Sequence, residues 1–204
     1  VANDRFGNQE ILSMVLQSDI EKIRTTLEEV DKTAFQGAVD AILGAKNIYI
    51  LGVRSSAAIA TFLSFYFNLM FDNVHHIHTS SNAEMFEQMI RIDKDDVVIG
   101  ISFPRYSSRT VKAMKFAYDR GATVIALTDS LAAPIARNAT HTLIAMSDMV
   151  SLVDSLVAPL SVVNALIVAC SYRKEEAISK TFANLEEIWD EYGVYEKVDD
   201  LGGV

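Results

Sequence analysis

The chain has 204 residues, half of them apolar, and its 27 acidic side chains outnumber its 18 basic ones to give a formal charge of −9. This charge excludes the broad basic surface on which DNA affinity depends, so we expect no DNA contact from the chain itself. The single cysteine, Cys170, excludes an internal disulfide bond and fits a cytoplasmic setting. The length suits one domain with helical extensions.

Two helices are predicted at the N-terminus. Apolar side chains recur with a helical period over residues 9–30 and again over 32–44. We expect a helical extension over 1–45, a central domain over 46–172, and a C-terminal helix and tail over 173–204. The first two helices and the helix predicted over 151–172 carry more apolar surface than one sheet needs for its cover. This surplus predicts self-association, as a homodimer or a higher homo-oligomer.

Strands and helices alternate from residue 47 onward. Short apolar runs predict five buried strands, over 47–51, 74–78, 96–102, 123–128 and 140–146. Helices are predicted between these strands and after the last one, over 55–71, 81–91, 107–120, 131–137, 151–172 and 175–192. This alternation is typical of parallel βαβ units. The predicted fold class is therefore α/β, a doubly wound parallel sheet of about five strands flanked by helices, with the N-terminal helical extension.

The most apolar stretch of the chain lies over residues 150–170. It also contains Asp154, Pro159 and Asn164, which a membrane-spanning helix disfavours. We therefore predict a buried helix there and no membrane partner. Residues 1–10 are polar and lack the apolar core of a secretory signal.

The loop over residues 102–110 carries the strongest indication of a ligand site. In an open parallel sheet, ligands bind beyond the carboxyl ends of the strands, where helix N-termini point inward. This loop gathers hydroxyls and arginines at the start of a predicted helix: Ser102, Arg105, Ser107, Ser108, Arg109 and Thr110. Free N–H groups and the helix dipole favour an anion there, and arginine binds phosphate well. The alternative is that Ser107 or Ser108 only caps the helix.

A second loop, over residues 52–56, supplies Ser55 and Ser56 at another predicted helix start. Gly52 would let the backbone approach a ligand, although a simple helix cap explains the two serines equally well. Neither loop has the glycine pattern of a dinucleotide site or of a P-loop. No cofactor is therefore expected.

Few residues are placed to act as a catalytic base or to hold a metal. Isomerisation of an aldose to a ketose needs a base close to the sugar carbons, and the candidates are Glu84, His76 and His78. The alternative for Glu84 is a solvated carboxylate at a helix start. His76 and His78 share one face of a strand, but no third ligand follows at a clear spacing, so no metal site is expected.

Three segments together resemble a sugar isomerase (SIS) domain over about residues 46–172. They are Ile-Leu-Gly-Val-Arg-Ser-Ser56, Gly-Ile-Ser102 with Ser107 and Thr110, and Gly-Ala-Thr-Val-Ile-Ala-Leu-Thr-Asp129. The variant Phe-Pro-Arg-Tyr-Ser107 and the predicted helix around 154–164 resemble more narrowly the RpiR-type transcription regulators. Those proteins carry a helix-turn-helix domain ahead of an SIS domain that senses a phosphorylated sugar.

The resemblance implies that Ser55, Ser102, Ser107 and Thr110 bind phosphate. This chain departs from the usual family loop by an insertion at 104–106 and by Ser108 in place of a glycine, so Ser108 and Arg105 join the candidate ligand-binding residues. The identity of the sugar is expected to depend on residues near Ser80, Asn82, Glu84 and Asp129.

The implied function is that of a sugar-phosphate-sensing effector domain, with DNA bound only through an N-terminal domain that this chain lacks. The alternative is a phosphosugar isomerase. Isomerases of the family often carry a glutamate in the helix of the 150s, where this sequence has none, and this difference favours the regulator.

Overall fold

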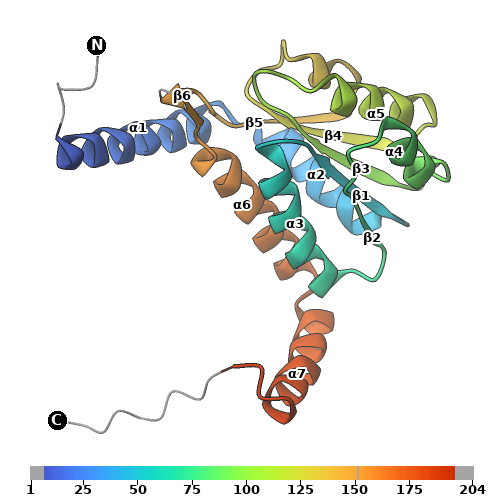
Figure 1. The fold of residues 1–204 in the computed structure, drawn as a ribbon. Helices are drawn as coiled ribbons and strands as arrows, with labels where there is room; N and C mark the ends of the chain where they lie inside the picture. The colour runs from blue at the N-terminus through green and yellow to red at the C-terminus, as the bar shows by residue number, and fades with distance from the viewer. Residues whose placement is uncertain (1–6, 151, 196–204) are drawn as a thin grey trace, which may run out of the picture.

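A five-stranded parallel sheet between two layers of helices forms the centre of the computed structural model, which describes residues 7–150 and 152–195 (Figure 1). Its strands are β1 (Ile48–Gly52), β2 (Val74–Ile77), β3 (Val97–Ile101), β4 (Thr123–Thr128) and β5 (His141–Ile144). They lie in the order β2-β1-β3-β4-β5, and every neighbouring pair is parallel. The predicted α/β fold class with five strands is confirmed.

The helices divide between the two faces of the sheet. One face is covered by α2 (Lys32–Gly44), α3 (Ser56–Met70) and α6 (Val157–Arg173), and the other by α4 (Asn82–Met89), α5 (Ser108–Asp119) and the short 3-10 helix η1 (Pro134–Asn138). Within β1, Ile48 and Ile50 face the first layer, whereas Tyr49 and Leu51 face the second, because successive side chains of a strand alternate. Both faces are covered, so every residue of β1 is buried.

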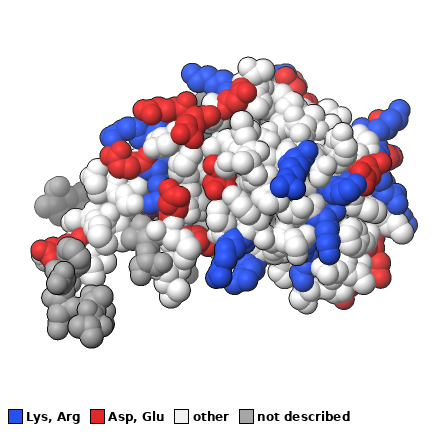
Figure 2. Space-filling view, turned by 90° about the horizontal axis from the view of Figure 1, so that it is seen from above, with Lys and Arg blue, Asp and Glu red and all other residues white. Residues whose placement is uncertain are grey.

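Two helices extend beyond this sandwich. Figure 1 shows α1 (Asn8–Glu29) projecting from the end of the molecule near α6, and α7 (Glu175–Glu191) continuing past the far end of α6. Apolar side chains of α1 remain uncovered: Leu12 is 59% exposed, Leu16 54% and Leu27 70%. On the face seen in Figure 2, basic and acidic side chains are interspersed and form no continuous basic surface.

The helix predicted over 151–172 begins later than expected, at Val157. Before it, β6 (Met149–Val150) and β7 (Val153–Asp154) pair in antiparallel fashion, and Ser151 between them lies outside the described residues. Pro159 explains the late start, because a residue without an N–H group fits only the first turn of a helix. None of the helices in the described parts of the chain is long and apolar enough to cross a membrane.

Candidate functional site

The strand order creates a crevice between β1 and β3. From β1 the chain passes to β2 on one side, whereas β4 and β5 follow on the other side of β3, so the loops at this point diverge. A cavity of about 230 Å³ lies beyond the carboxyl ends of these two strands, and we call it the first cavity. Its polar lining includes Arg54, Ser55, Ser102, Arg105, Ser107 and Asp154. The structure thus brings together four of the six predicted ligand-binding residues.

The start of α3 depends on an unusual backbone turn. A Cβ atom on Gly52 would lie 2.5 Å from the carbonyl oxygen of Ser56, so only glycine permits this close approach. Arg54 has a φ of 58°, in the left-handed region, and Ser55 follows in right-handed helical conformation. Such a pair turns successive N–H groups toward one side, which makes a concavity for an anion. The Ser55 hydroxyl does not cap α3 but donates to Oδ2 of Asp154 at 3.0 Å.

The start of α5 is held by local hydrogen bonds. Ser107 is the N-cap, because its Oγ accepts from the N–H of Thr110 at 3.4 Å. The N–H of Ser107 in turn donates to Oγ of Ser102, a 3%-exposed residue directly after β3, at 3.2 Å. Ser107 therefore caps the helix and also lines the cavity, so its role as a cap does not exclude contact with a ligand.

A second cavity, of about 480 Å³, adjoins the first and shares Val53, Arg54 and Ser107 with it. The loop after β2 supplies Thr79, Ser80 and Asn82, and Ser108 faces it from α5. Arg109 holds this wall in place, since its guanidinium donates to Oδ1 of Asn82 at 2.9 Å, to the Thr79 carbonyl at 2.9 Å and to the Ser80 carbonyl at 2.6 Å. Hydroxyls and an amide make this cavity suitable for a polyhydroxylated ligand.

Two arginines at the first cavity are free to meet an anion. Within the described residues Arg54 and Arg105 form no ion pair, and both are exposed. Asp154 is the single carboxylate in the described lining of this cavity. The charged groups around the first cavity therefore favour an anion on balance.

Tyr106 connects the loop after β3 to the loop after β4. Its hydroxyl donates to the two carboxylate oxygens of Asp129 at 2.9 and 3.2 Å. Burial, together with the hydrogen bond to the Asp129 carboxylate, raises the pKa of Tyr106 to about 12. The phenol therefore remains a neutral donor at physiological pH, and the loop after β4 supports the site through Tyr106.

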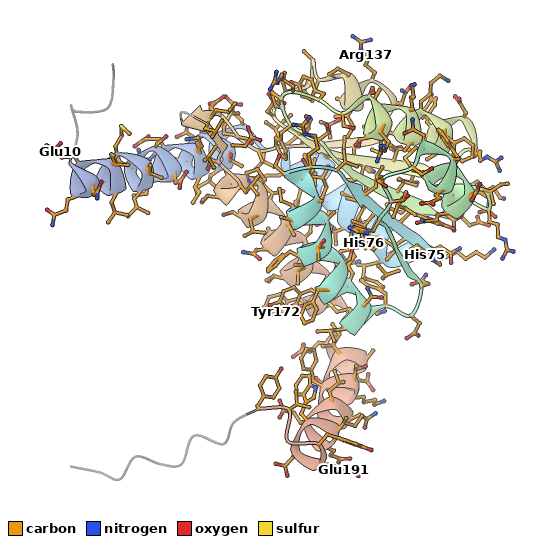
Figure 3. The ribbon with its side chains drawn as sticks, in the orientation of Figure 1. Glu10, His75, His76, Arg137, Tyr172 and Glu191 are labelled. Carbon is orange, nitrogen blue, oxygen red and sulfur yellow. The ribbon has the colours of Figure 1, made fainter. Side chains whose placement is uncertain are left out.

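Two of the three candidate bases, Glu84 and His76, lie outside both cavities, whereas His78 lines the second cavity. Glu84, exposed in the first turn of α4, accepts a hydrogen bond from the Thr79 hydroxyl. His76 lies next to His75 on β2 (Figure 3), and its Nε2 has no hydrogen-bond partner among the described residues. Burial, followed by the charge of His78, lowers the pKa of His76. Across residues 7–150 and 152–195, no three potential ligands gather to hold a metal ion.

Thr110 differs from the other predicted ligand-binding residues. It is 0% exposed and lines neither cavity. Its Oγ1 is buried without a partner in the described part of the chain. The phosphate contact implied by the resemblance stays a prediction for this residue.

Sequence reasoning did not assign roles to Arg54 and Asp154. Arg54 stands in the loop after β1, where its only sequence signal is its position between Gly52 and a helix start. Asp154 meets Ser55 from 99 residues away, so no local spacing could reveal the contact.

This arrangement, with two hydroxyl-rich helix starts at the switch point of a parallel sheet, defines an anion-binding α/β domain. The model of the SIS domain matches residues 41–169, and the chain belongs to this family. The sugar isomerase domain of an RpiR transcription factor from Sphaerobacter thermophilus is 30% identical, with a TM-score of 0.81, over 86% of this chain and 97% of that chain.

Two further proteins are similar to the chain, one in sequence and one in fold. An uncharacterized HTH-type transcriptional regulator of Haemophilus influenzae is 28% identical over 135 residues, which are 65% of this chain and 46% of the relative. The chain thus spans about half the length of that relative. The Vibrio vulnificus NanR protein, solved with ManNAc-6P, shares the fold with a TM-score of 0.78 at 18% identity, over 91% of this chain and 70% of that chain.

Proposed function

We propose that this chain is the effector domain of a cytoplasmic transcription regulator and that it binds a phosphorylated sugar. The phosphate occupies the first cavity, where it meets Ser55, Ser102, Ser107 and the side chains of Arg54 and Arg105. The sugar extends into the second cavity toward Ser80, Asn82 and Ser108. The observation that carries the proposal is that two helix N-termini and two unpaired arginines converge on one cavity.

The relatives support the assignment to a regulator. The Haemophilus influenzae relative is described as a transcriptional regulator and is about twice as long as the matched segment. We assign DNA binding to a part of the protein beyond this chain, because the chain carries a charge of −9 and the face in Figure 2 has no continuous basic surface. No retardation of a DNA duplex by this chain is expected, and salt-dependent retardation would contradict the assignment.

An isomerase needs a base within hydrogen-bonding reach of the sugar carbons. Glu84 and His76 reach neither cavity, whereas His78 lines the second cavity and is the one candidate base near the proposed sugar. The description of the Haemophilus influenzae relative as a regulator favours binding over catalysis, so we expect no interconversion of aldose and ketose phosphates. Turnover at about 1 per second or faster, within the usual range of enzymes, would favour the isomerase instead.

Calorimetric titration tests the ligand class. We would titrate inorganic phosphate, ManNAc-6P, a panel of hexose and pentose phosphates, and the same sugars without phosphate into the chain. At least one phosphosugar should bind about 100-fold more tightly than its unphosphorylated form, since several charge-assisted hydrogen bonds are lost with the phosphate. Ser102→Ala should weaken this binding, whereas Ser171→Ala, on the exposed side of α6 where its hydroxyl bonds to Val168, should not. Equal affinities with and without phosphate would refute the proposal.

We also propose that the chain forms a homodimer or a higher homo-oligomer through α1 and α6. Exposed apolar side chains of α1 adjoin a groove of about 180 Å³ between the two helices, lined by Ile23, Leu27, Phe35, Val162 and others. A second copy is the simplest cover for such a surface. Light scattering at micromolar concentration should give at least twice the monomer mass, and a monomeric mass would contradict this part of the proposal.

A further inference from the structure

Two consecutive residues connect the first cavity to α1. Asp154, at the end of β7, accepts the hydrogen bond from the Ser55 hydroxyl inside the cavity at 3.0 Å. The next residue, Ser155, donates from its hydroxyl to Oδ1 of Asp19 on α1 at 2.6 Å. Asp154, Ser155 and Asp19 are all partly buried. A displacement of Asp154 is therefore passed directly to a side chain that holds α1.

The hydrogen bond between Ser55 and Asp154 is incompatible with a phosphate that uses Ser55. A serine hydroxyl carries one proton and donates to one acceptor at a time. A phosphate dianion bound by Ser55 would also face the negative charge of Asp154 at close range, and like charges at such a distance repel. A phosphate that accepted the Ser55 proton would thus break this contact and repel the Asp154 carboxylate.

The attachment of α1 makes it sensitive to such a change. The outer part of the helix, which ends near Glu10 (Figure 3), projects from the molecule with Ile11 and Leu12 exposed. Its inner half lies against α6 and makes two polar contacts to the domain: Asp19 with Ser155, and the Thr26 hydroxyl with the N–H of Met146 at 2.9 Å. The Ser155 contact is therefore one of a small number that set the position of α1.

We propose that Asp154 and Ser155 form a relay by which phosphate binding loosens α1. Ser55 exchanges Asp154 for the phosphate, Asp154 leaves the cavity, and Ser155 moves with it and releases Asp19. The inference rests on the proposed phosphate site. Any chain that precedes the described residues connects to the sheet through α1. Ligand binding would therefore change how firmly that preceding segment is held against the domain.

The first test is the affinity for inorganic phosphate. Asp154→Asn removes the negative charge and keeps the size of the side chain, so phosphate should bind about tenfold more tightly than to the wild type. Asp154→Ala, which removes the competing acceptor altogether, should bind at least as tightly. Unchanged or weaker binding by both variants would overturn the relay, and weaker binding would indicate that Asp154 instead holds the ligand.

The second test follows hydrogen exchange of the α1 amides over residues 15–26. Saturating phosphate should speed their exchange in the wild type by about threefold or more, because a contact of the helix is lost. Ser155→Ala should keep its affinity for phosphate, exchange faster without ligand, and show no further change with it. Ser171→Ala, near the C-terminal end of α6 where its hydroxyl bonds to the Val168 carbonyl, is the control and should respond like the wild type.

The outcomes separate the relay from the site on which it rests. If phosphate binds the wild type but leaves α1 exchange unchanged, the relay is wrong and the site stands. If phosphate speeds α1 exchange in Ser155→Ala as it does in the wild type, the relay is likewise wrong and the site stands. If neither inorganic phosphate nor any phosphosugar binds the wild type, the relay is overturned together with the proposed function.

Discussion

The two helices that meet at the first cavity begin in different ways. At α5, Ser107 caps the helix through the N–H of Thr110, and Tyr106 ties the preceding loop to Asp129. At α3 no side chain caps the helix, Arg54 adopts a left-handed backbone, and Ser55 donates to distant Asp154. One helix start is stabilised by its own neighbours, while the other holds its hydroxyl in a contact that a ligand can replace. The first is suited to position an anion and the second to respond to it.

The largest expected effect comes from removing a hydroxyl at both helix starts. Ser55→Ala with Ser107→Ala should weaken binding of a phosphosugar about 100-fold or more, because two charge-assisted hydrogen bonds are lost. Calorimetric titration of the double variant and both single variants measures this. If only one of the two single variants loses affinity for the phosphosugar, only that helix start contacts the phosphate.

The connection of the α5 loop to β4 is tested by Tyr106→Phe. Loss of a hydrogen bond to a carboxylate should lower the free energy of unfolding by about 1.5 kcal/mol, and Tyr118→Phe, on the exposed face of α5, is the control. The raised pKa of Tyr106 adds a pH dependence. Its stabilisation is complete below the ordinary value of 10.0 and is lost as pH rises toward about 12, so the wild type and Tyr118→Phe should show this added loss and Tyr106→Phe should not. Urea unfolding from pH 7 to 11 checks both points, and equal pH profiles would contradict them.

The difference between a cap and a distant contact predicts different costs for two serines. Ser107→Ala removes the cap of α5 and should cost about 1 kcal/mol of stability. Ser55→Ala removes an exposed contact and should cost less than about 0.5 kcal/mol. Denaturant unfolding of both variants measures the difference. Equal losses would show that Ser55 supports the fold as much as Ser107 does.

Thr110 should show the smallest effect. Its hydroxyl is buried without a partner in the described chain, so Thr110→Val replaces an unsatisfied polar atom with a methyl group. Stability should be unchanged or higher by up to about 1 kcal/mol, with unchanged affinity for phosphosugar. Melting curves and titration test this. A clear loss of affinity would show that Thr110 turns toward the ligand, as the family resemblance implies.

The helices and strands, and the edge of the sheet at which the candidate site lies, were predictable from the sequence. Apolar runs such as 97–101 mark strands covered on both faces, and parallel strands place the loops after β1 and β3 at one edge. The strand order was not predictable, because periodicity reports which faces are buried and not which strands are neighbours. The contact of Ser55 with Asp154 follows from that order and from the β6–β7 pair.

The burial of Thr110 was predictable from the helical spacing of the sequence, but its hydroxyl favoured a ligand-binding interpretation. Thr110, Ala113, Met114 and Ala117 are the buried residues of α5, and their spacing is that of one helical face. The hydroxyl of Thr110 suggests a contact with the ligand, whereas the helical spacing of the buried residues of α5 places Thr110 in the core. Pro159 likewise marks the first turn of α6, so the helix start near Val157 follows from the chemistry of proline.

The position of β1, the first strand of the chain, between β2 and β3 in the sheet has a consequence for the lifetime of the protein. On the proposed function, the bound phosphate joins the loop after β1 to the loop after β3, so the ligand acts as a removable cross-link between two neighbouring strands that β2 separates in sequence. At about 100 times its dissociation constant, such a ligand adds about 2.7 kcal/mol to the free energy of unfolding. Because proteases act mainly on opened chains, the abundance of this protein would rise and fall with the supply of its sugar phosphate.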